Sequence, residues 1–244
     1  MEGKSILITG ASTGLGAETA RRLAKGNTVY IHYNTSADAA KAVAEDVESA
    51  GGNAFVVQAD LSNDEGCESL FQQIQSKTDH LDVLINNAGS GLGRYSVKEI
   101  DWQKLTNIFA LNAFSVMRLT SLFIPLLEQG TNSCVVNISS VAARSGAPTA
   151  TIYGAAKGAI DTFTRGSAKE LAPQIRVNSI APGTFETPFH DTMTPKEKLQ
   201  ELRGMTPLKR NGETRHIAQT VQFLIENDFI TGECIDVNGG YSMR

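Results

Sequence analysis

The sequence is poor in cysteine, and its histidines stand apart from one another. Cys67, Cys134 and Cys234 are widely separated among 244 residues and form no C-x-x-C pair. This spacing argues against a disulfide framework and a thiolate zinc site, and it is typical of a protein that keeps reduced thiols in the cytoplasm. The four histidines show no H-E-x-x-H or similar ligand spacing, so we expect no metal site.

The chain also lacks an excess of basic residues and long apolar runs. Its 22 Lys and Arg residues against 26 Asp and Glu residues give a formal net charge of −4, which argues against a nucleic-acid groove. No uninterrupted apolar run reaches the roughly 18–20 residues of a membrane span. Residues 1–4 lead directly into the apolar run Ser5–Ile8, without the layout of a signal peptide. We therefore expect a cytoplasmic protein that binds neither nucleic acid nor membrane.

What the sequence does have is a regular alternation of short β-branched runs with longer helical patterns. Continuous Val and Ile runs are typical of strands covered on both faces, and strand–helix alternation with short loops is typical of a doubly wound parallel sheet. No linker or repeat divides residues 1–244, so we expect a single α/β domain. The predicted strands are 6–8, 28–31, 54–57, 83–85, 134–138 and 176–180, and the predicted helices are 15–25, 37–49, 64–76, 99–127 and 153–171.

The segment 184–205 breaks this alternation. It contains Pro188, Pro195, Gly204 and charges of both signs, and a short helix is expected near 196–202. In a compact sheet protein such an excursion is usually a binding loop. We expect a substrate lid here, and the alternative is an insertion that only packs on the surface.

Glycine is abundant, with 22 residues, and the first cluster lies in Thr9–Gly16, between a predicted strand and a predicted helix. Glycines in this place permit a tight turn and bring backbone N–H groups close to a pyrophosphate at the positive end of the helix. Three residues separate Gly10 from Gly14, unlike the commoner G-x-G-x-x-G. Taken alone, the cluster is also compatible with a plain strand-to-helix turn.

Two more polar clusters follow predicted strands. Asn86–Gly89 comes after the fourth strand, and Ser139 and Ser140 come after the fifth. In an open parallel sheet, ligands bind beyond the carboxyl ends of the strands, at the topological switch point. Asn and Gly are also common in turns, so it is the position of Asn86–Gly89 that suggests a site.

Tyr153 and Lys157 are four residues apart and share one face of a predicted helix. A phenol has a pKa of about 10, which is high for proton transfer near neutral pH, and a neighbouring ammonium favours the phenolate. Lowering that pKa by roughly three units corresponds to about 4 kcal/mol. We expect Lys157 and a bound cationic cofactor ring to supply it together. Tyr and Lys at this spacing are also ordinary surface residues, but Gly154, Ala155 and Ala156 between them permit close packing.

Taken together, these clusters resemble the short-chain dehydrogenase/reductase family over nearly the entire chain. Thr9–Gly16 matches the family's T-G-x-x-x-G-x-G loop, and Asn86–Gly89 matches its N-N-A-G motif. Phe229–Gly232 and Val237–Gly240 match the pattern of its last strand. The resemblance implies a single Rossmann-type domain with a doubly wound parallel sheet of about seven strands.

The resemblance also implies a catalytic tetrad of Asn112, Ser140, Tyr153 and Lys157. Ser140 would hydrogen-bond the substrate carbonyl, and Tyr153 would give it a proton as hydride arrives from the cofactor. Lys157 would hold the nicotinamide ribose and lower the pKa of Tyr153. Asn112 would organise a water that connects Lys157 to solvent. The implied reaction reduces a carbonyl to an alcohol, or runs in reverse.

We predict NADP(H) as the cofactor, with NAD(H) as the alternative. An NAD site generally places an acid about 20 residues beyond the glycine loop, whereas here the second strand ends in His32–Ser36, without an acid. Lys41, one turn into the next helix, is a candidate partner of a 2′-phosphate. The residues predicted to bind the cofactor are Gly10, Ser12, Thr13, Gly14, Leu15, Gly16, Asn34, Thr35, Ser36, Asp60, Leu61, Asn87, Ala88, Gly89, Tyr153, Lys157, Pro182, Gly183, Thr184 and Thr187.

The resemblance leaves the substrate open between a 3-oxoacyl thioester, a small ketone and a sugar. Residues 128–133 and 172–174 contain no Lys or Arg, which argues against docking of an acidic acyl-carrier protein there. Arg144 either pairs with an anionic substrate group or is a solvated loop residue. The candidate substrate residues are Arg94, Arg144, Phe185, His190 and Met193.

The resemblance further implies a homotetramer, or a homodimer. Its interfaces would use the long fifth helix with the Tyr153 helix, and the final helix with the final strand. The apolar residues Ala218, Val221, Phe223 and Leu224 fit either the second interface or ordinary core packing.

One function of a different class stays open, a regulatory or scaffold protein that binds the cofactor without catalysis. The four spaced residues of the tetrad argue against it.

Overall fold

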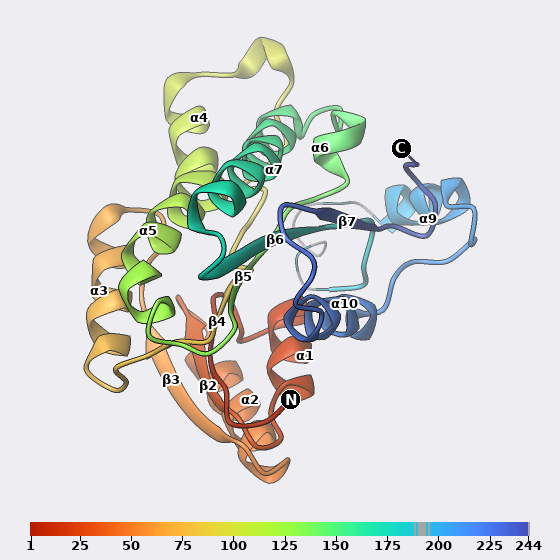
Figure 1. Cartoon of the computed structure of the whole chain (residues 1–244). Helices are drawn as coiled ribbons and strands as arrows, with labels where there is room; N and C mark the ends of the chain where they lie inside the picture. Colours follow the sequence, from red (N-terminus) through yellow and green to blue (C-terminus); the bar gives the residue numbers. More distant parts are fainter. Residues whose placement is uncertain (188, 190–193, 195, 244) are drawn as a thin grey trace.

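Seven parallel strands form one sheet in the computed structural model, which describes residues 1–187, 189, 194 and 196–243 (Figure 1). The strand order is β3-β2-β1-β4-β5-β6-β7, and every pair is parallel. The chain order reverses between β1 and β4, which makes this the topological switch point. The predicted doubly wound sheet is therefore confirmed. Its strands are β1 (Ser5–Ile8), β2 (Thr28–Tyr33), β3 (Asn53–Gln58), β4 (Val83–Asn86), β5 (Ser133–Ile138), β6 (Ile175–Pro182) and β7 (Cys234–Val237).

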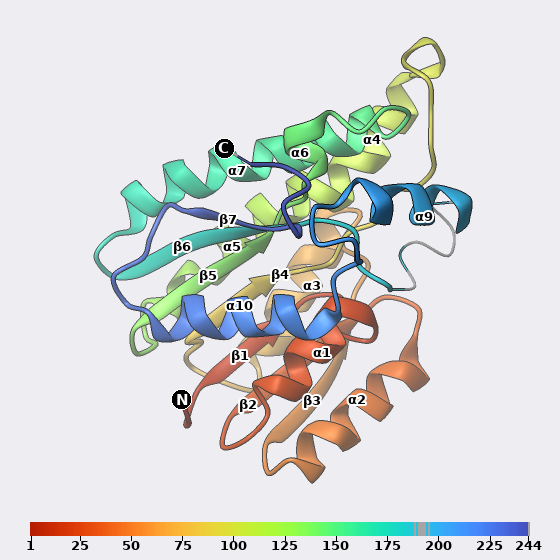
Figure 2. The same ribbon diagram turned by 90° about the vertical axis from the view of Figure 1, so that its right-hand side faces the viewer.

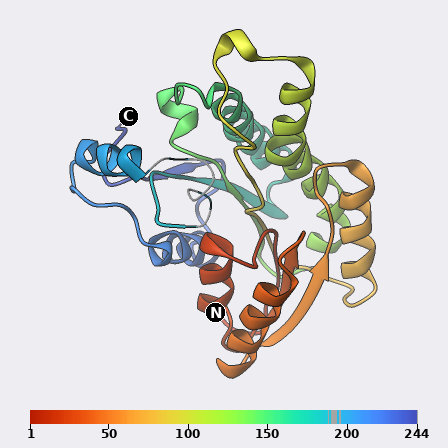
Figure 3. The same ribbon diagram turned by 180° about the vertical axis from the view of Figure 1, so that it is seen from behind.

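Helices cover both faces of the sheet (Figure 2). In β1, Ile6 and Ile8 join the core under α1, α2 and α10, whereas Leu7 joins the core on the opposite face. Both faces of the central strands β1, β4, β5 and β6 are buried, which explains why their sequences are continuous apolar runs. Figure 3 shows α3, in orange, beside the yellow-green α5. The helices on the first face are α1 (Gly14–Arg22), α2 (Ala37–Ser49) and α10 (Thr214–Glu226), and those on the second are α3 (Asp64–Gln75), α5 (Ser115–Leu127) and α7 (Thr151–Leu171).

The single helix predicted over 99–127 is divided in the structure. A 3-10 turn, η1 (Val97–Glu99), precedes α4 (Trp102–Phe109), and a π turn, η2 (Ala110–Phe114), joins α4 to α5. The Asp101 carboxylate accepts a hydrogen bond from the Lys104 N–H at 2.8 Å and starts α4. A π turn leaves little trace in a 3.6-residue hydrophobic pattern, so the sequence did not indicate it.

The stretch Trp102–Leu127 is the one helical segment among the described residues that is long and apolar enough to cross a membrane. The 18-residue window of this stretch that meets the criterion has a mean hydropathy of 1.5, and half of that window is buried inside the protein. Leu119 and Phe123 lie in the core under α3, where the rings of Phe71 and Phe123 meet edge to face at 5.3 Å. Core helices of this kind satisfy the same length and hydropathy criteria as a span.

Two further helices complete the described fold. α6 (Ala142–Ser145) follows β5, and α9 (Lys196–Met205) is longer than the helix expected over 196–202. Two of the candidate substrate residues, His190 and Met193, lie outside the described residues. The function of 184–205 as a lid stays a prediction.

The apolar set on α10 belongs to the core of the chain itself. Ala218, Val221 and Leu224 are fully buried, whereas Phe223 is 47% exposed. Three of the four residues are thus explained by core packing rather than by an interface, and the tetramer stays a prediction.

The buried Arg176 side chain on β6 caps the carboxyl end of α10 by hydrogen bonds. The last carbonyls of a helix have no partner within the helix, and the buried Arg176 guanidinium donates to four carbonyls there. Nη1 donates to Leu224 at 2.8 Å, Asn227 at 3.0 Å and Ile230 at 3.1 Å, and Nη2 donates to Ile225 at 3.0 Å.

We expect Arg176→Met to lower the free energy of unfolding by about 3 kcal/mol, because it leaves buried carbonyls without donors. Urea unfolding measures the change. Arg165→Met is the matched control, since the exposed Arg165 guanidinium contacts Thr162 one turn earlier on α7, and a surface change of this kind costs at most about 0.5 kcal/mol. Equal losses in the two variants would contradict this account of Arg176.

Candidate active site

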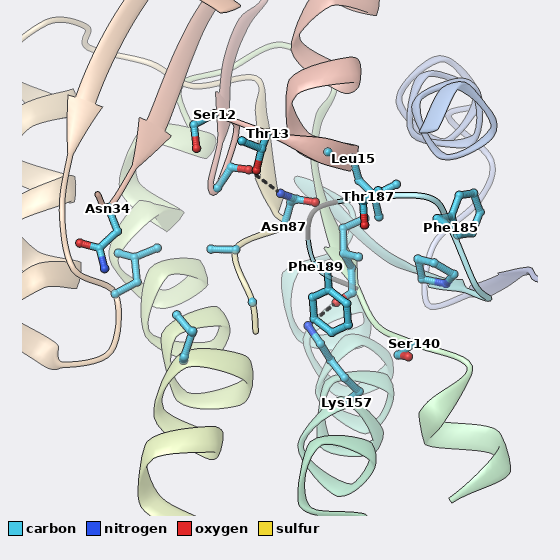
Figure 4. Close-up of a pocket in the computed structure, with 18 of the residues that line it drawn as sticks. Ser12, Thr13, Leu15, Asn34, Asn87, Ser140, Lys157, Phe185, Thr187 and Phe189 are labelled. Carbon is cyan, nitrogen blue, oxygen red and sulfur yellow. Dashed lines mark hydrogen bonds between the residues drawn. The ribbon is translucent and has the colours of Figure 1, made fainter. Parts of the chain in front are cut away.

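A cavity of about 340 Å³ opens at the carboxyl ends of the strands, at the switch point between β1 and β4. Figure 4 shows Asn34 at one end of it, and Ser140 and Phe185 at the other. The cavity brings together most of the residues predicted from the sequence. Those that line it are Gly10, Ser12, Thr13, Gly14, Leu15, Asn34, Thr35, Ser36, Leu61, Asn87, Ala88, Gly89, Ser140, Tyr153, Lys157, Pro182, Gly183, Phe185 and Thr187.

The glycine loop has the geometry of a phosphate cradle. Gly10 and Gly14 have φ angles of 63° and 56°, a left-handed region that favours glycine. A Cβ on Gly16 would lie 2.4 Å from the Gly10 oxygen and 2.6 Å from Asn87 Nδ2, so the helix approaches the loop too closely for a side chain. The first turn of α1 contains no acidic residue, and the Thr13 side chain does not cap it. The helix therefore presents N–H groups and the positive end of its dipole to the cavity, which fits the pyrophosphate of a dinucleotide.

Hydrogen bonds lock this loop to the segment after β4. Asn87 Nδ2 donates to the Thr9 oxygen at 2.8 Å and to the Gly10 oxygen at 3.0 Å. In return, Thr9 Oγ1 accepts from the N–H groups of Asn87 and Ala88, both at 2.9 Å. The glycine loop and the segment Asn87–Ala88 are thus joined by four hydrogen bonds at the switch point.

His32 is a residue of this site that the sequence analysis missed. It is buried at the carboxyl end of β2, and its Nδ1 accepts a hydrogen bond from the Gly10 N–H at 2.9 Å. Nε2 lies 3.1 Å from the Ala59 oxygen, so the proton of the neutral ring sits on Nε2. Burial lowers the pKa of His32 to about 4, which keeps the ring neutral near pH 7. The position of His32 near the end of a predicted strand was the sequence signal that could have identified it as a residue of the site.

Three residues of the predicted tetrad meet at the end of β5. The buried Lys157 Nζ donates to the Ile138 oxygen at 2.7 Å and lies 5.8 Å from the centre of the Tyr153 ring. The Ser140 side chain lowers the pKa of the Tyr153 hydroxyl, so the two hydroxyls are neighbours. Ser140 Oγ also accepts from the Ala142 N–H at 3.1 Å, at the start of α6. The structure therefore places two hydroxyls and an ammonium in one cavity wall.

Asn112 lies behind this wall, in the π turn, and is fully buried. Its Nδ2 donates to the oxygens of Ser90 at 2.7 Å and Ile108 at 2.8 Å, and its Oδ1 accepts from the Ser90 N–H at 3.1 Å. A Cβ on Gly89 would lie 2.9 Å from Asn112 Oδ1 and 3.4 Å from Lys157 Nζ. The Asn112 amide and the Lys157 ammonium are thus neighbours, and a role for Asn112 in a water relay stays a prediction.

The lowered pKa expected for Tyr153 depends on a bound cofactor ring as well as on Lys157, so it stays a prediction, and burial acts in the opposite direction. Burial raises the pKa of Tyr153 to about 12, with the hydrogen bond from Ser140 acting in the opposite direction. Burial also lowers the pKa of Lys157 to about 8, against the effect of the Asp161 carboxylate. Desolvation of the phenol therefore outweighs any help from Lys157. At neutral pH the phenol holds its proton and Lys157 is charged, an arrangement suited to proton donation.

The structure corrects the prediction for Arg144. Its guanidinium forms an ion pair with Asp161, and its Nε lies 3.3 Å from Asp236 Oδ1. The side chain is 15% exposed and is held between α6, α7 and β7, away from the cavity wall. Arg144 is therefore neither a substrate ligand nor a solvated loop residue.

Arg94 does not line the cavity, and its guanidinium hydrogen-bonds neighbouring loops. Its Nη1 donates to Thr149 Oγ1 at 3.0 Å, and its Nη2 lies 3.4 Å from Thr194 Oγ1. The guanidinium thus ties the loop before η1 to the loop before α7 and to the segment before α9. Arg94 thus bridges three segments, and its predicted contact with substrate stays a prediction.

Three predicted cofactor residues lie next to the cavity rather than in its wall. Gly16 packs under the glycine loop, and Asp60 Oδ1 accepts from the Ser62 N–H at 3.0 Å. Thr184 lines a neighbouring cavity on the far side of Phe185.

Five lining residues were not predicted from the sequence: His32, Leu111, Ile138, Ser139 and Phe189. Over the part of the chain that the structure describes, no group of three or more His, Cys, Asp or Glu side chains is placed to hold a metal ion.

A parallel sheet with a phosphate cradle at its switch point, beside a Ser–Tyr–Lys set, defines a dinucleotide-dependent oxidoreductase. A family model described as enoyl-(acyl carrier protein) reductase matches residues 10–242. The uncharacterized oxidoreductase YgfF of Escherichia coli (strain K12) is 34% identical over 242 residues, covering 96% of this chain and 98% of that protein. The 3-oxoacyl-[acyl-carrier-protein] reductase FabG of Staphylococcus aureus (strain Mu50) is 33% identical over 246 residues, with 98% of each covered.

Solved structures agree with these relatives. The crystal structure of the angucycline C-6 ketoreductase LanV with bound NADP matches with a TM-score of 0.90 at 31% identity, covering 98% of this chain and 96% of that one. The chain therefore belongs to the short-chain dehydrogenase/reductase family. It is an NAD(P)-dependent oxidoreductase that interconverts a carbonyl and an alcohol.

Proposed function

We propose that this protein is an NADPH-dependent carbonyl reductase that uses Tyr153 as the proton donor. The observation that supports this most is the continuity of the cavity, which runs from the glycine loop to the wall formed by Ser140, Tyr153 and Lys157. A dinucleotide bound along it has its pyrophosphate at the positive end of α1 and its reactive ring beside Tyr153. The cofactor supplies the hydride.

The residues of the wall supply the hydrogen bond to the carbonyl, the proton and the positive charge. The Ser140 hydroxyl donates a hydrogen bond to the substrate carbonyl oxygen, and Tyr153 Oη transfers its proton to that oxygen as negative charge develops on it. Lys157, charged at neutral pH, stabilises the phenolate that remains and hydrogen-bonds the ribose. The reverse reaction uses the same groups, with the phenolate as base.

The choice of NADPH is supported by the far end of the cavity. The wall there consists of Asn34, Thr35 and Ser36, whose uncharged side chains can hydrogen-bond a 2′-phosphate without repelling it. Lys41 lies one turn into α2, where it is 4.0 Å from Asp38 and exposed. LanV, a relative of the same fold, was solved with bound NADP.

We expect Asn34→Asp to reduce the preference for NADPH over NADH by about tenfold or more, because a carboxylate at the end of β2 repels the 2′-phosphate and accepts from a free ribose hydroxyl. The measurement is kcat/KM for each cofactor. Asn34→Ala is the control, since it removes the amide without adding charge. A wild-type enzyme that prefers NADH would contradict the proposed cofactor.

The substrate wall is apolar and aromatic. Phe185 and Phe189 line the Tyr153 end of the cavity, and the rings of Phe189 and Tyr153 lie 5.9 Å apart. This composition favours a ketone or a 3-oxoacyl thioester over a sugar, whose hydroxyls need polar partners. Oxidation of NADPH with a panel of ketones, acyl thioesters and sugars tests the proposal. Cofactor binding without turnover on any of them would favour the regulatory or scaffold alternative.

A further inference from the structure

An ionic cluster that the proposed reaction does not use lies behind the tetrad, where α6, α7 and β7 meet (Figure 1). It consists of Arg144 on α6, Asp161 on α7 and Asp236 on β7, whose side chains are 15%, 5% and 18% exposed. Arg144 forms an ion pair with Asp161, and its Nε lies 3.3 Å from Asp236 Oδ1. Arg144 Nη2 also donates to Cys234 Sγ at 2.8 Å, and Cys234 Sγ lies 3.4 Å from Asp161 Oδ1.

The Arg144–Asp161 pair joins the two elements that present the reacting hydroxyls. α6 begins two residues after Ser140, and the Ser140 Oγ accepts from its first N–H. α6 also touches α7 where a Cβ on Gly154 would lie 2.9 Å from the Ala142 oxygen. The Arg144–Asp161 ion pair is a second contact between α6 and α7, in addition to this close approach, and so ties the helix that follows Ser140 to the helix that contains the tyrosine.

The same pair controls the charge next to Lys157. Asp161 follows Lys157 by one turn of α7, so the two side chains are neighbours on the helix. Burial of Lys157 disfavours its ammonium, and the Asp161 carboxylate is the group that opposes this. Because both groups are buried, their attraction is screened far less than it would be on the surface.

The charges that act on Lys157 come from several elements. Tyr153 and Asp161 are on its own helix, and the Asn112 amide faces it from η2. The Ile138 oxygen accepts from its Nζ at the end of β5. The groups that act on it through Asp161 are Arg144 on α6, and Cys234 and Asp236 on β7.

We propose that Asp161 and Arg144 are positioning residues of the reductase: Asp161 keeps Lys157 charged for binding NADPH and stabilising the tyrosinate, and Arg144, which pairs with Asp161, limits how strongly it does so. This rests on the proposed function of Lys157. It assigns opposite electrostatic roles to two residues that pair with each other. Asp161 favours the ammonium of Lys157, whereas the Arg144 guanidinium disfavours it.

The test is the pH dependence of NADPH binding, followed by the change in NADPH fluorescence between about pH 6 and pH 10. In the wild type, binding weakens above about pH 8, where Lys157 loses its proton. Asp161→Asn removes the carboxylate, so the midpoint is expected to fall by about one pH unit. Arg144→Gln leaves that carboxylate unneutralised, so the midpoint is expected to rise. The alkaline limb of kcat/KM for carbonyl reduction is expected to move in the same two directions.

Asp236→Asn is the matched control. It also replaces a carboxylate of the cluster by an amide, but Asp236 is on β7, whereas Asp161 is on α7, the helix that contains Lys157. Asp236 acts on Lys157 only through Arg144 and Asp161, so the Asp236→Asn midpoint is expected to shift much less than that of Asp161→Asn. Arg144→Lys is expected to bring the Arg144→Gln midpoint back. A shift of Asp161→Asn and Arg144→Gln in the same direction, no shift in either, or an equal shift in Asp236→Asn would overturn the proposal.

Binding without turnover and a check of folding make the outcome of this experiment unambiguous. Binding of NADPH is read without turnover, so an enzyme that reduces none of the carbonyls tried still reports on Lys157, and failure of the proposed function is told apart from failure of this inference. Circular dichroism identifies any variant that does not fold. If Asp161→Asn is such a variant, the comparison of Arg144→Gln with Arg144→Lys carries the test.

Discussion

Tyr153→Phe is expected to lower kcat for carbonyl reduction by about 10²–10⁴-fold, the range associated with loss of a positioned proton donor. The ring of Tyr153 packs against Phe189 at 5.9 Å and lies 5.8 Å from Lys157 Nζ. Phenylalanine preserves both contacts and removes only Oη, the neighbour of the Ser140 hydroxyl. The affinity for NADPH is therefore expected to stay close to that of the wild type.

The experiment compares kcat with the dissociation constant of NADPH in the same variant. Tyr95→Phe is the matched control, because the Tyr95 hydroxyl donates to the Leu92 oxygen at 2.8 Å in a loop near the cavity but outside its wall. The control is expected to retain its kcat. A Tyr153→Phe enzyme with wild-type turnover would exclude Tyr153 as the proton donor.

The sheet and most of the cavity could be predicted because the relevant signals are local. A strand buried on both faces leaves a continuous apolar run, as in Ser5–Ile8 and Ser133–Ile138. In a parallel sheet all such runs end at one edge, so motifs far apart in the chain, such as Thr9–Gly16 and Asn86–Gly89, could be assigned to the same place.

The features that the sequence did not reveal depend on packing between elements. Neither role predicted for Arg144, pairing with an anionic substrate group or lying solvated in a loop, includes its ion pairs, because its partners Asp161 and Asp236 belong to other elements. The raised pKa of Tyr153 follows from burial, which the Tyr–Lys spacing does not report. Asn112 was identified by its motif, but the π turn that positions it replaces only a few residues of an otherwise helical pattern.

The glycine loop provides the second prediction with a large expected effect, the substitution Gly16→Ala. The new Cβ would lie 2.4 Å from the Gly10 oxygen and 2.6 Å from Asn87 Nδ2. Those two atoms are themselves hydrogen-bonded at 3.0 Å, so neither can move without displacing the loop that faces the pyrophosphate. Overpacking of this kind costs about 1–3 kcal/mol, and at tenfold for every 1.4 kcal/mol we expect NADPH binding to weaken by about 10–100-fold.

Gly158→Ala separates this steric effect from the general effect of adding a methyl group. A Cβ on Gly158, in the middle of α7, meets no atom within 4 Å, and alanine is favoured over glycine inside a helix by about 1 kcal/mol. Gly158→Ala is thus expected to raise the thermal midpoint slightly and to leave NADPH binding unchanged, whereas Gly16→Ala is expected to lower both. If the two variants bound NADPH equally well, the loop between β1 and α1 would not be the phosphate site, and the orientation of the cofactor along the cavity would have to be reversed.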